Sequence, residues 1–122
     1  MTSPTQRTLA KLRKEGYYAA ICEKWNVFAR RRIDLFGGDI LAIKEGEGGP
    51  LLIQCTTAAN QSHRLKKTIS LSSVKTWLLC GGRFEVWGWS KKGKRGKRKL
   101  WSVSIRVVTL EDFGDVGKPP LD

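Results

Sequence analysis

Histidine is nearly absent from this chain of 122 residues, in which His63 stands alone. Zinc sites draw their ligands mainly from histidine and cysteine, and Cys22, Cys55 and Cys80 show no Cys-x-x-Cys spacing. The sequence therefore disfavours a zinc site. We expect the cysteines to be buried free thiols in a reducing, cytosolic setting, and His63 to be an exposed helix residue.

Long hydrophobic runs are also missing, since no apolar stretch approaches the roughly 18 residues that a membrane-spanning helix needs. The segment FGGD at 36–39 lacks the lysine and the spacing of a nucleotide-binding phosphate loop, and there is no nucleophile elbow. We therefore expect a soluble protein with no membrane partner and no small-molecule cofactor. Hydrophobic residues make up 40% of the chain, enough for one folded domain.

Acidic residues are scarce: 11 aspartates and glutamates face 23 lysines and arginines, for a formal net charge of +12. The run KKGKRGKRK at 91–99 carries seven of the basic residues, yet the remainder of the chain is still positive. This charge predicts a polyanionic partner, and nucleic acid is favoured over membrane because no basic amphipathic helix accompanies it. A solvated loop that only aids solubility is the alternative for 91–99.

The hydrophobic pattern predicts one α/β domain over residues 1–110 and a loose tail over 111–122. Ser3 and Pro4 begin a helix over 4–15. Strands are expected over 17–25, 40–43 and 51–57, then a basic helix over 60–67 and a second helix ending at 80. Paired strands over 83–90 and 100–108 follow, with the basic run as their loop. This order predicts an α/β sandwich with a mixed sheet.

Two polar residues interrupt the apolar strands at positions that can be neighbours across the sheet. Asp39 opens one strand, and Gln54 lies in the next, after a tight turn. Because side chains alternate along a strand, Gln54 and Thr56 share one face and Cys55 lies on the other. Asp39, Gln54 and the backbone carbonyl of Cys55 could converge on one point. Oxygen ligands of this kind suit Mg²⁺, which could activate water and hold a phosphate.

Three more carboxylates, those of Glu15, Glu23 and Asp34, could reach the same edge of the sheet. Clustered carboxylates repel phosphate unless a cation neutralises them, so a pure binding surface would have little use for them. Alternatively, Asp34 is a cap or an arginine partner and Glu23 is a solvated strand residue. Tryptophans 87, 89 and 101 are expected to pack across strands, with base stacking by Trp25 or Trp89 as the alternative.

Asp39 followed by Gln54-Cys55-Thr56 resembles the metal-binding motif of the PD-(D/E)XK nuclease superfamily. Together with the segments EKWN at 23–26 and RRIDLFG at 31–37, it is similar to small, often phage-encoded Holliday-junction resolvases over residues 5–108. The resemblance implies a restriction-endonuclease-like αβββαβ core with a mixed central sheet flanked by helices. It further implies Mg²⁺-dependent cleavage of branched DNA, with Mn²⁺ able to substitute, by a homodimer in the cytoplasm of a bacterial or phage-infected cell.

The same resemblance assigns roles to individual residues. Asp39, Gln54 and Glu23 would be catalytic and would bind the metal with Cys55. The family usually has a lysine where this chain has Thr56, so Lys66, Lys67 or Lys24 would have to replace it. Independently of the resemblance, the basic segments predict that phosphates are held by Arg30, Arg31, Arg32, Arg64, Lys92, Lys94, Arg95, Lys97 and Arg98. A catalytically inactive binder, a nuclease for linear or nicked DNA and a small RNA-associated protein are the alternatives.

Overall fold

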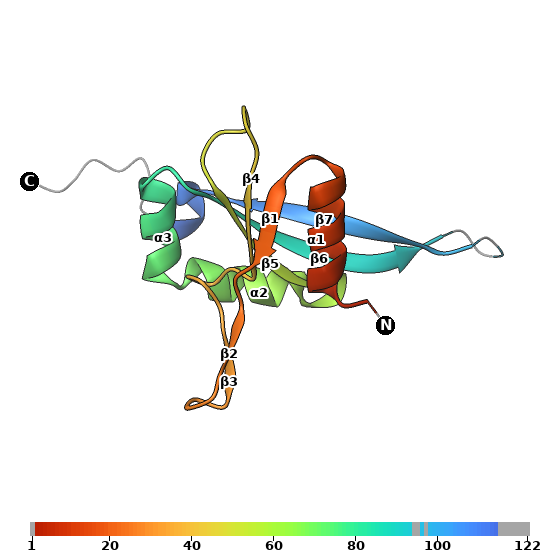
Figure 1. Ribbon diagram of the computed structural model, residues 1–122, viewed down its shortest axis with the longest axis horizontal. Coiled ribbons are helices and arrows are strands. Elements are labelled where there is room, and N and C mark those ends of the chain that lie inside the picture. The colour runs from red at the N-terminus through yellow and green to blue at the C-terminus, as the bar shows by residue number, and fades with distance from the viewer. Residues whose placement is uncertain (1, 94–95, 97, 115–122) are drawn as a thin grey trace, which may run out of the picture.

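A five-stranded mixed sheet flanked by helices forms the body of the protein in the computed structural model, which describes residues 2–93, 96 and 98–114 (Figure 1). The helices are α1 (Pro4–Lys14), α2 (Gln61–Ile69) and α3 (Ser72–Leu79), with short 3-10 turns at Ala58–Asn60 and Leu110–Phe113. The strands are β1 (Tyr18–Ile21), β2 (Lys24–Asn26), β3 (Arg31–Ile33), β4 (Ile40–Ile43), β5 (Leu51–Thr57), β6 (Arg83–Lys92) and β7 (Leu100–Val108). No helix in these described ranges has the length and apolar character needed to span a membrane.

The strand order is β1-β4-β5-β6-β7; β5 and β6 are parallel, and the other three neighbouring pairs are antiparallel. Strands β1, β4 and β5 form an antiparallel meander, and β6 and β7 form a long antiparallel hairpin. Parallel pairing of β5 with β6 requires a crossover connection, which α2 and α3 supply. The main sheet and its helices thus follow the order αβββαβ from α1 to β6, with α3 added to the crossover. The expected α/β class and mixed sheet are confirmed.

Helix α1 begins where the sequence predicts and ends one residue earlier than expected. The Ser3 hydroxyl accepts a hydrogen bond from the Gln6 backbone nitrogen at 3.2 Å, and Pro4 occupies the first helical turn. Leu9 and Leu12 are buried against the sheet. The helix therefore packs by the apolar face that the sequence predicts, and its N-terminal turn lies at one end of the sheet.

Each face of the sheet has its own hydrophobic cluster, and the alternation of β5 divides its side chains between them. Ile53 and Cys55 belong to the cluster beneath α1, whereas Leu52 belongs to the cluster that includes Val74 of α3. Gln54 therefore lies on the face covered by α2 and α3. Trp87 and Trp89 pack on the α1 face with ring centroids 6.4 Å apart, but both lie on β6, so this contact is made along one strand and not across strands as predicted.

The segment 17–25 differs from the single strand that the sequence predicts. The chain leaves the sheet after Ile21, and β2 pairs with β3 in a separate two-stranded ribbon. The reason lies in β4, which begins only at Ile40 because a tight turn at 35–38 precedes it. Cys22 still donates its N–H to the Asp39 carbonyl, but residues 24–26 lie beyond the start of β4 and pair instead with 31–33.

Two further expectations need correction. Cys80 is exposed at the end of α3, whereas Cys55 is buried and Cys22 is half-buried, so the prediction of three buried thiols is wrong for Cys80. The chain after residue 110 begins with a 3-10 turn, and Phe113 packs against the cluster beneath α2 and α3. The rest of the expected tail, 115–122, lies outside the described residues.

Candidate active site

Asp39 is placed by a two-residue turn directly before β4. Leu35 and Gly38 bridge each other, and Phe36 and Gly37 both have positive φ angles, 51° and 89°, as a type I′ turn requires. Gly37 meets this requirement without strain, and its N–H donates to Asp34 Oδ1 at 3.1 Å. The FGGD segment is therefore a turn that fixes the position from which Asp39 enters the sheet.

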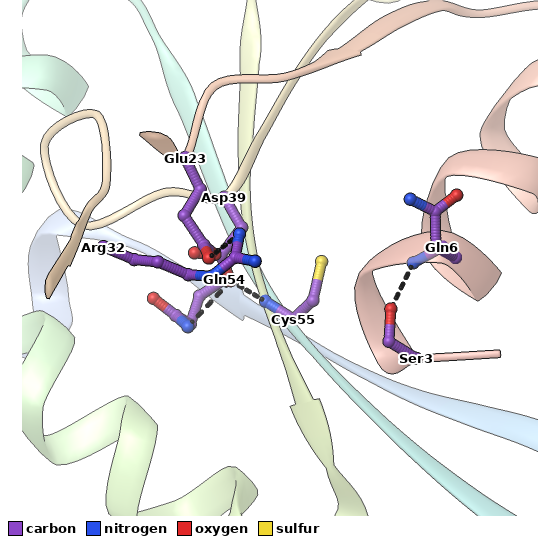
Figure 2. Close-up of polar contacts among 7 residues, drawn as sticks. All are labelled: Ser3, Gln6, Glu23, Arg32, Asp39, Gln54 and Cys55. Atoms are coloured by element: carbon purple, nitrogen blue, oxygen red, sulfur yellow. Dashed lines mark hydrogen bonds and ion pairs between the residues drawn. The ribbon is translucent and has the colours of Figure 1, made fainter. Parts of the chain in front are cut away.

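The backbone of Asp39 is held on both sides. Its N–H donates to the Ile53 carbonyl at 2.8 Å, and its carbonyl accepts from the Cys22 N–H at 2.9 Å. Its side chain is 5% exposed, and Oδ2 accepts hydrogen bonds from Gln54 Nε2 and the Cys55 N–H, both at 2.9 Å (Figure 2). The structure thus brings the three residues together, although the Cys55 atom in contact with Asp39 is the backbone nitrogen and not the carbonyl oxygen that the sequence predicts.

A polar pocket of about 300 Å³ opens over Asp39 and Gln54. Its lining combines three carboxylates with three cations: Glu23, Asp34 and Asp39 face Arg32, Arg64 and Lys67, and Thr5, Gln54 and Cys55 complete the wall. These lining residues belong to α1, the β2–β3 ribbon and its flanking residues, β5 and α2, which meet at this end of the sheet. Such a mixture can accept a hard cation and a phosphate side by side.

The carboxyl group of Asp39 is poised to titrate near neutrality. Burial raises the pKa of Asp39 from 3.8 to about 7, opposed by the hydrogen bond from the Cys55 N–H. The neighbouring carboxylates of Glu23 and Asp34 raise this pKa further. A buried acid surrounded by other acids is a common feature of functional sites, because a bound cation would relieve the repulsion.

Glu23 lies at the base of the β2–β3 ribbon and is paired with Arg32. Arg32 Nη1 lies 3.0 Å from Glu23 Oε1, and Figure 2 shows the two side chains beside Asp39 and Gln54. The carboxylate of Glu23 is mostly buried while the guanidinium of Arg32 is largely exposed. Glu23 is therefore within the pocket as predicted, but neutralised by an arginine that was expected to hold phosphate.

The two candidate lysines of α2 occupy different places. Lys67 lines the pocket one helical turn beyond Arg64, whereas Lys66 is exposed and is not among the lining residues. Lys24 lies on the ribbon away from this pocket. Thr56 is buried and pairs with Gly88 within the sheet. Of the possible replacements for the usual motif lysine, the pocket contains Lys67.

Other predicted residues lie elsewhere. Glu15 is the C-cap residue that follows α1 and pairs with Lys11 at 3.2 Å, and it does not line the pocket, so the expectation that it could reach this site is wrong. His63 is exposed on α2, as expected.

Trp89 is buried and its indole N–H donates to Thr8 Oγ1 at 2.9 Å, so it cannot stack on a base. Trp25 remains available because 60% of its surface is exposed.

The predicted phosphate-binding residues form two groups. Arg30, Arg31 and Arg32 lie on the ribbon and Arg64 in the pocket, while Lys92 and Arg98 flank the β6–β7 loop. Lys94, Arg95 and Lys97 lie outside the described residues. Thr5 also lines the pocket and was not predicted; its position in the first turn of α1, two residues after the capping Ser3, was the available signal.

The donor set suits a small hard cation better than a transition metal. Burial raises the pKa of the Cys55 thiol to about 12, so this residue could offer a carbonyl oxygen but not a thiolate. Among the described residues, no group of three or more His, Cys, Asp or Glu side chains is arranged to hold a metal ion. Mg²⁺ does not need such a group, because it binds through one or two carboxylates and keeps several waters.

Comparison of the chain with protein-family models, with curated proteins and with solved structures gives no match.

Proposed function

We propose that this protein is a metal-dependent, structure-selective endonuclease of the PD-(D/E)XK type that hydrolyses phosphodiester bonds in branched DNA. The observation that carries the proposal is the hydrogen bond between buried Asp39, directly before β4, and Gln54, in the middle of β5, inside a pocket that is also lined by cations. The αβββαβ order of the main elements supports a restriction-endonuclease-like core. A homodimer would match a symmetric junction with two equivalent cuts.

Asp39, the amide oxygen of Gln54 and the carbonyl of Cys55 would hold Mg²⁺, with Glu23 assisting. A bound Mg²⁺ supplies Lewis acidity toward the phosphate and lowers the pKa of water. Asp39 must first lose its proton, since a cation binds only the ionised carboxylate. Gln54 must turn its amide, because its nitrogen now faces Asp39.

The cations of the pocket would act on the phosphate. Lys67 would offset the charge that develops on the phosphate in the transition state, in the role that lysine at the Thr56 position usually has. Arg64 lies one helical turn away on the same face of α2 and would bind an adjacent phosphate. These residues position the backbone and carry no base code, so selectivity would come from the shape of the DNA.

The experiment compares substrates under single-turnover conditions. A labelled four-way junction, a nicked duplex and a matched linear duplex are incubated with Mg²⁺, Mn²⁺ or EDTA. The proposal predicts cleavage of the junction that requires a divalent ion and exceeds cleavage of the linear duplex. Preference for the linear or nicked duplex would replace the branched-DNA assignment with a general nuclease, and no cleavage with any ion would overturn the enzymatic assignment.

A catalytically inactive nucleic-acid-binding protein is the second candidate, and one observation favours it. Thr56 occupies the position of the usual lysine, and Asp39 already has hydrogen-bonding partners in Gln54 and Cys55 that give it a structural role. A binder should hold the junction as tightly, or more tightly, when Asp39→Asn removes a negative charge. Binding without cleavage in every metal, unchanged in Asp39→Asn, would favour this candidate.

A further inference from the structure

The β2–β3 ribbon contributes little to the sheet yet displays large apolar side chains. Its two strands pair with each other outside the main sheet, and it projects from the body of the molecule (Figure 1). Phe28 at its tip is 100% exposed, Val27 is 73% exposed and Trp25 is 60% exposed. Apolar side chains gathered on a protruding element commonly mark an interaction surface.

The tip of the ribbon is held in a defined turn. Asn26 Oδ1 accepts a hydrogen bond from the Ala29 N–H at 2.8 Å, so the side chain of Asn26 closes the turn. Arg30 adopts a positive φ of 51°, which returns the chain into β3. Val27 and Phe28 are therefore presented at the apex before any partner binds, which reduces the entropic cost of using them.

The charge of the ribbon identifies the partner. The segment 24–33 contains Lys24, Arg30, Arg31 and Arg32 and no acidic residue. Cations along the sides with an apolar apex match nucleic acid, in which phosphates lie outside and stacked bases inside. The ribbon also begins at the pocket, because Glu23 and Arg32 at its base line that pocket. This location favours nucleic acid over a membrane surface, since the same DNA can reach both elements.

We propose that the β2–β3 ribbon is a wedge: Phe28, supported by Val27, inserts between bases at the branch point while Arg30 and Arg31 bind the flanking phosphates. The inference rests on the proposed function, which it deepens by naming the element that selects branched DNA. Side chains of this kind unstack base steps and kink the duplex, and a branch point is already partly unstacked. The wedge would open the DNA beside the pocket in which it is cut.

The test uses a four-way junction with 2-aminopurine beside the branch point, whose fluorescence rises when the base is unstacked. Full-length protein is added in EDTA, so that no cleavage occurs, and Phe28→Ala is compared with wild type. Tyr18→Ala is the matched control, because Tyr18 is an aromatic residue, 81% exposed, on the edge strand β1 outside both pocket and ribbon. A fully exposed side chain can be truncated without unfolding the protein.

The wedge predicts a fluorescence rise with wild type and Tyr18→Ala that is at least halved in Phe28→Ala. Phe28→Ala should also bind the junction about fivefold more weakly or worse, the scale of one base–aromatic stacking interaction. An equal rise with Phe28→Ala, or none with wild type, would overturn the wedge even if the junction is cut. A Phe28-dependent rise without cleavage in any metal would retain the wedge and overturn the nuclease. Absence of DNA binding would overturn both.

Discussion

The side chain of Asp39 takes the place of a strand partner for Cys55. The β4–β5 ladder ends at the pair Ile40 and Ile53, and just beyond it the Cys55 N–H donates to Asp39 Oδ2 at 2.9 Å. A carboxylate therefore completes the hydrogen bonding of the sheet where a backbone carbonyl would otherwise be needed. The hydrogen bond from the Cys55 N–H favours the ionised form of this carboxyl group, whereas burial and the nearby carboxylates of Glu23 and Asp34 favour the protonated form. The structural role of Asp39 and its surroundings therefore favour opposite protonation states.

This opposition predicts an unusual stability profile for Asp39→Asn. The pKa of Asp39 is about 7 in the folded protein against 3.8 ordinarily, so between about pH 4 and pH 7 the unfolded chain loses a proton that the folded protein keeps. The free energy of unfolding of wild type should fall across this window. The asparagine side chain would keep an acceptor for the Cys55 N–H without titrating, so the variant should be the more stable protein at pH 8 and gain little at pH 4.

Urea denaturation in EDTA at pH 4, 6 and 8 measures this difference, with Glu47→Gln in the exposed turn before β5 as the control. The midpoint of Asp39→Asn relative to wild type should rise with pH, while the control should stay level. An equal loss of stability in Asp39→Asn at every pH would show that the carboxylate is needed for packing and that its negative charge does not destabilise the folded protein.

The neighbouring lysines of α2 offer a test with a built-in control. Lys67 lines the pocket and Lys66 does not, although both are exposed and carry the same charge. Lys67→Ala should slow cleavage by about 10²- to 10³-fold, the usual effect of removing one group that stabilises transition-state charge. Lys66→Ala should remain within a few fold of wild type. Single-turnover rates at saturating enzyme separate this effect from binding, and similar rates for both variants would remove Lys67 from the site.

Glu23 should tune the pH dependence of cleavage, since it raises the pKa of Asp39. The rate should rise with pH through about 7 as Asp39 becomes able to bind the cation. Glu23→Gln should move this midpoint to lower pH and reduce the maximal rate by about ten- to 100-fold, as expected of a group that supports a metal ligand. Glu47→Gln should leave the profile unchanged. An unchanged midpoint in Glu23→Gln would show that the acids are not coupled.

Salt should weaken binding steeply, and the basic β6–β7 hairpin should account for part of that dependence. Replacing Lys92 and Arg98 with glutamine should make the slope of log K against log salt shallower by about one for each phosphate that the variant no longer binds. Lys14→Gln, at the end of α1, is the matched control and should keep the wild-type slope. Titrations between about 50 and 200 mM salt, the range over which such effects are large, provide the slopes.

The sequence predicts the main sheet well because its signals are local. The apolar runs of β4 and β5, the Ser3-Pro4 start of α1 and the alternation of β6 and β7 each depend on residues next to one another in the chain. The meeting of Asp39 with Gln54 also follows, because a tight turn and a two-residue period place them together.

The β2–β3 ribbon could not be predicted in the same way. Its formation depends on where β4 begins, which is set by the turn at Phe36 and Gly37, and not on the propensity of 24–33. The pairing of Glu23 with Arg32 and the choice of Lys67 over Lys66 depend in turn on that ribbon and on the exact rotation of α2. These features depend on packing between residues that are far apart in the sequence, and such packing leaves no local sequence pattern from which it could be predicted.

The most direct measurement is the rate at which wild type and Asp39→Asn cut the labelled four-way junction as Mg²⁺ is increased. We predict that wild type cuts with a saturable dependence on Mg²⁺, and that Asp39→Asn binds the junction but cuts at least about 100-fold more slowly, a larger loss than removal of a supporting residue causes. Equal cleavage by both proteins, or cleavage by neither while both bind, would contradict the claim that Asp39 belongs to a metal-dependent nuclease site.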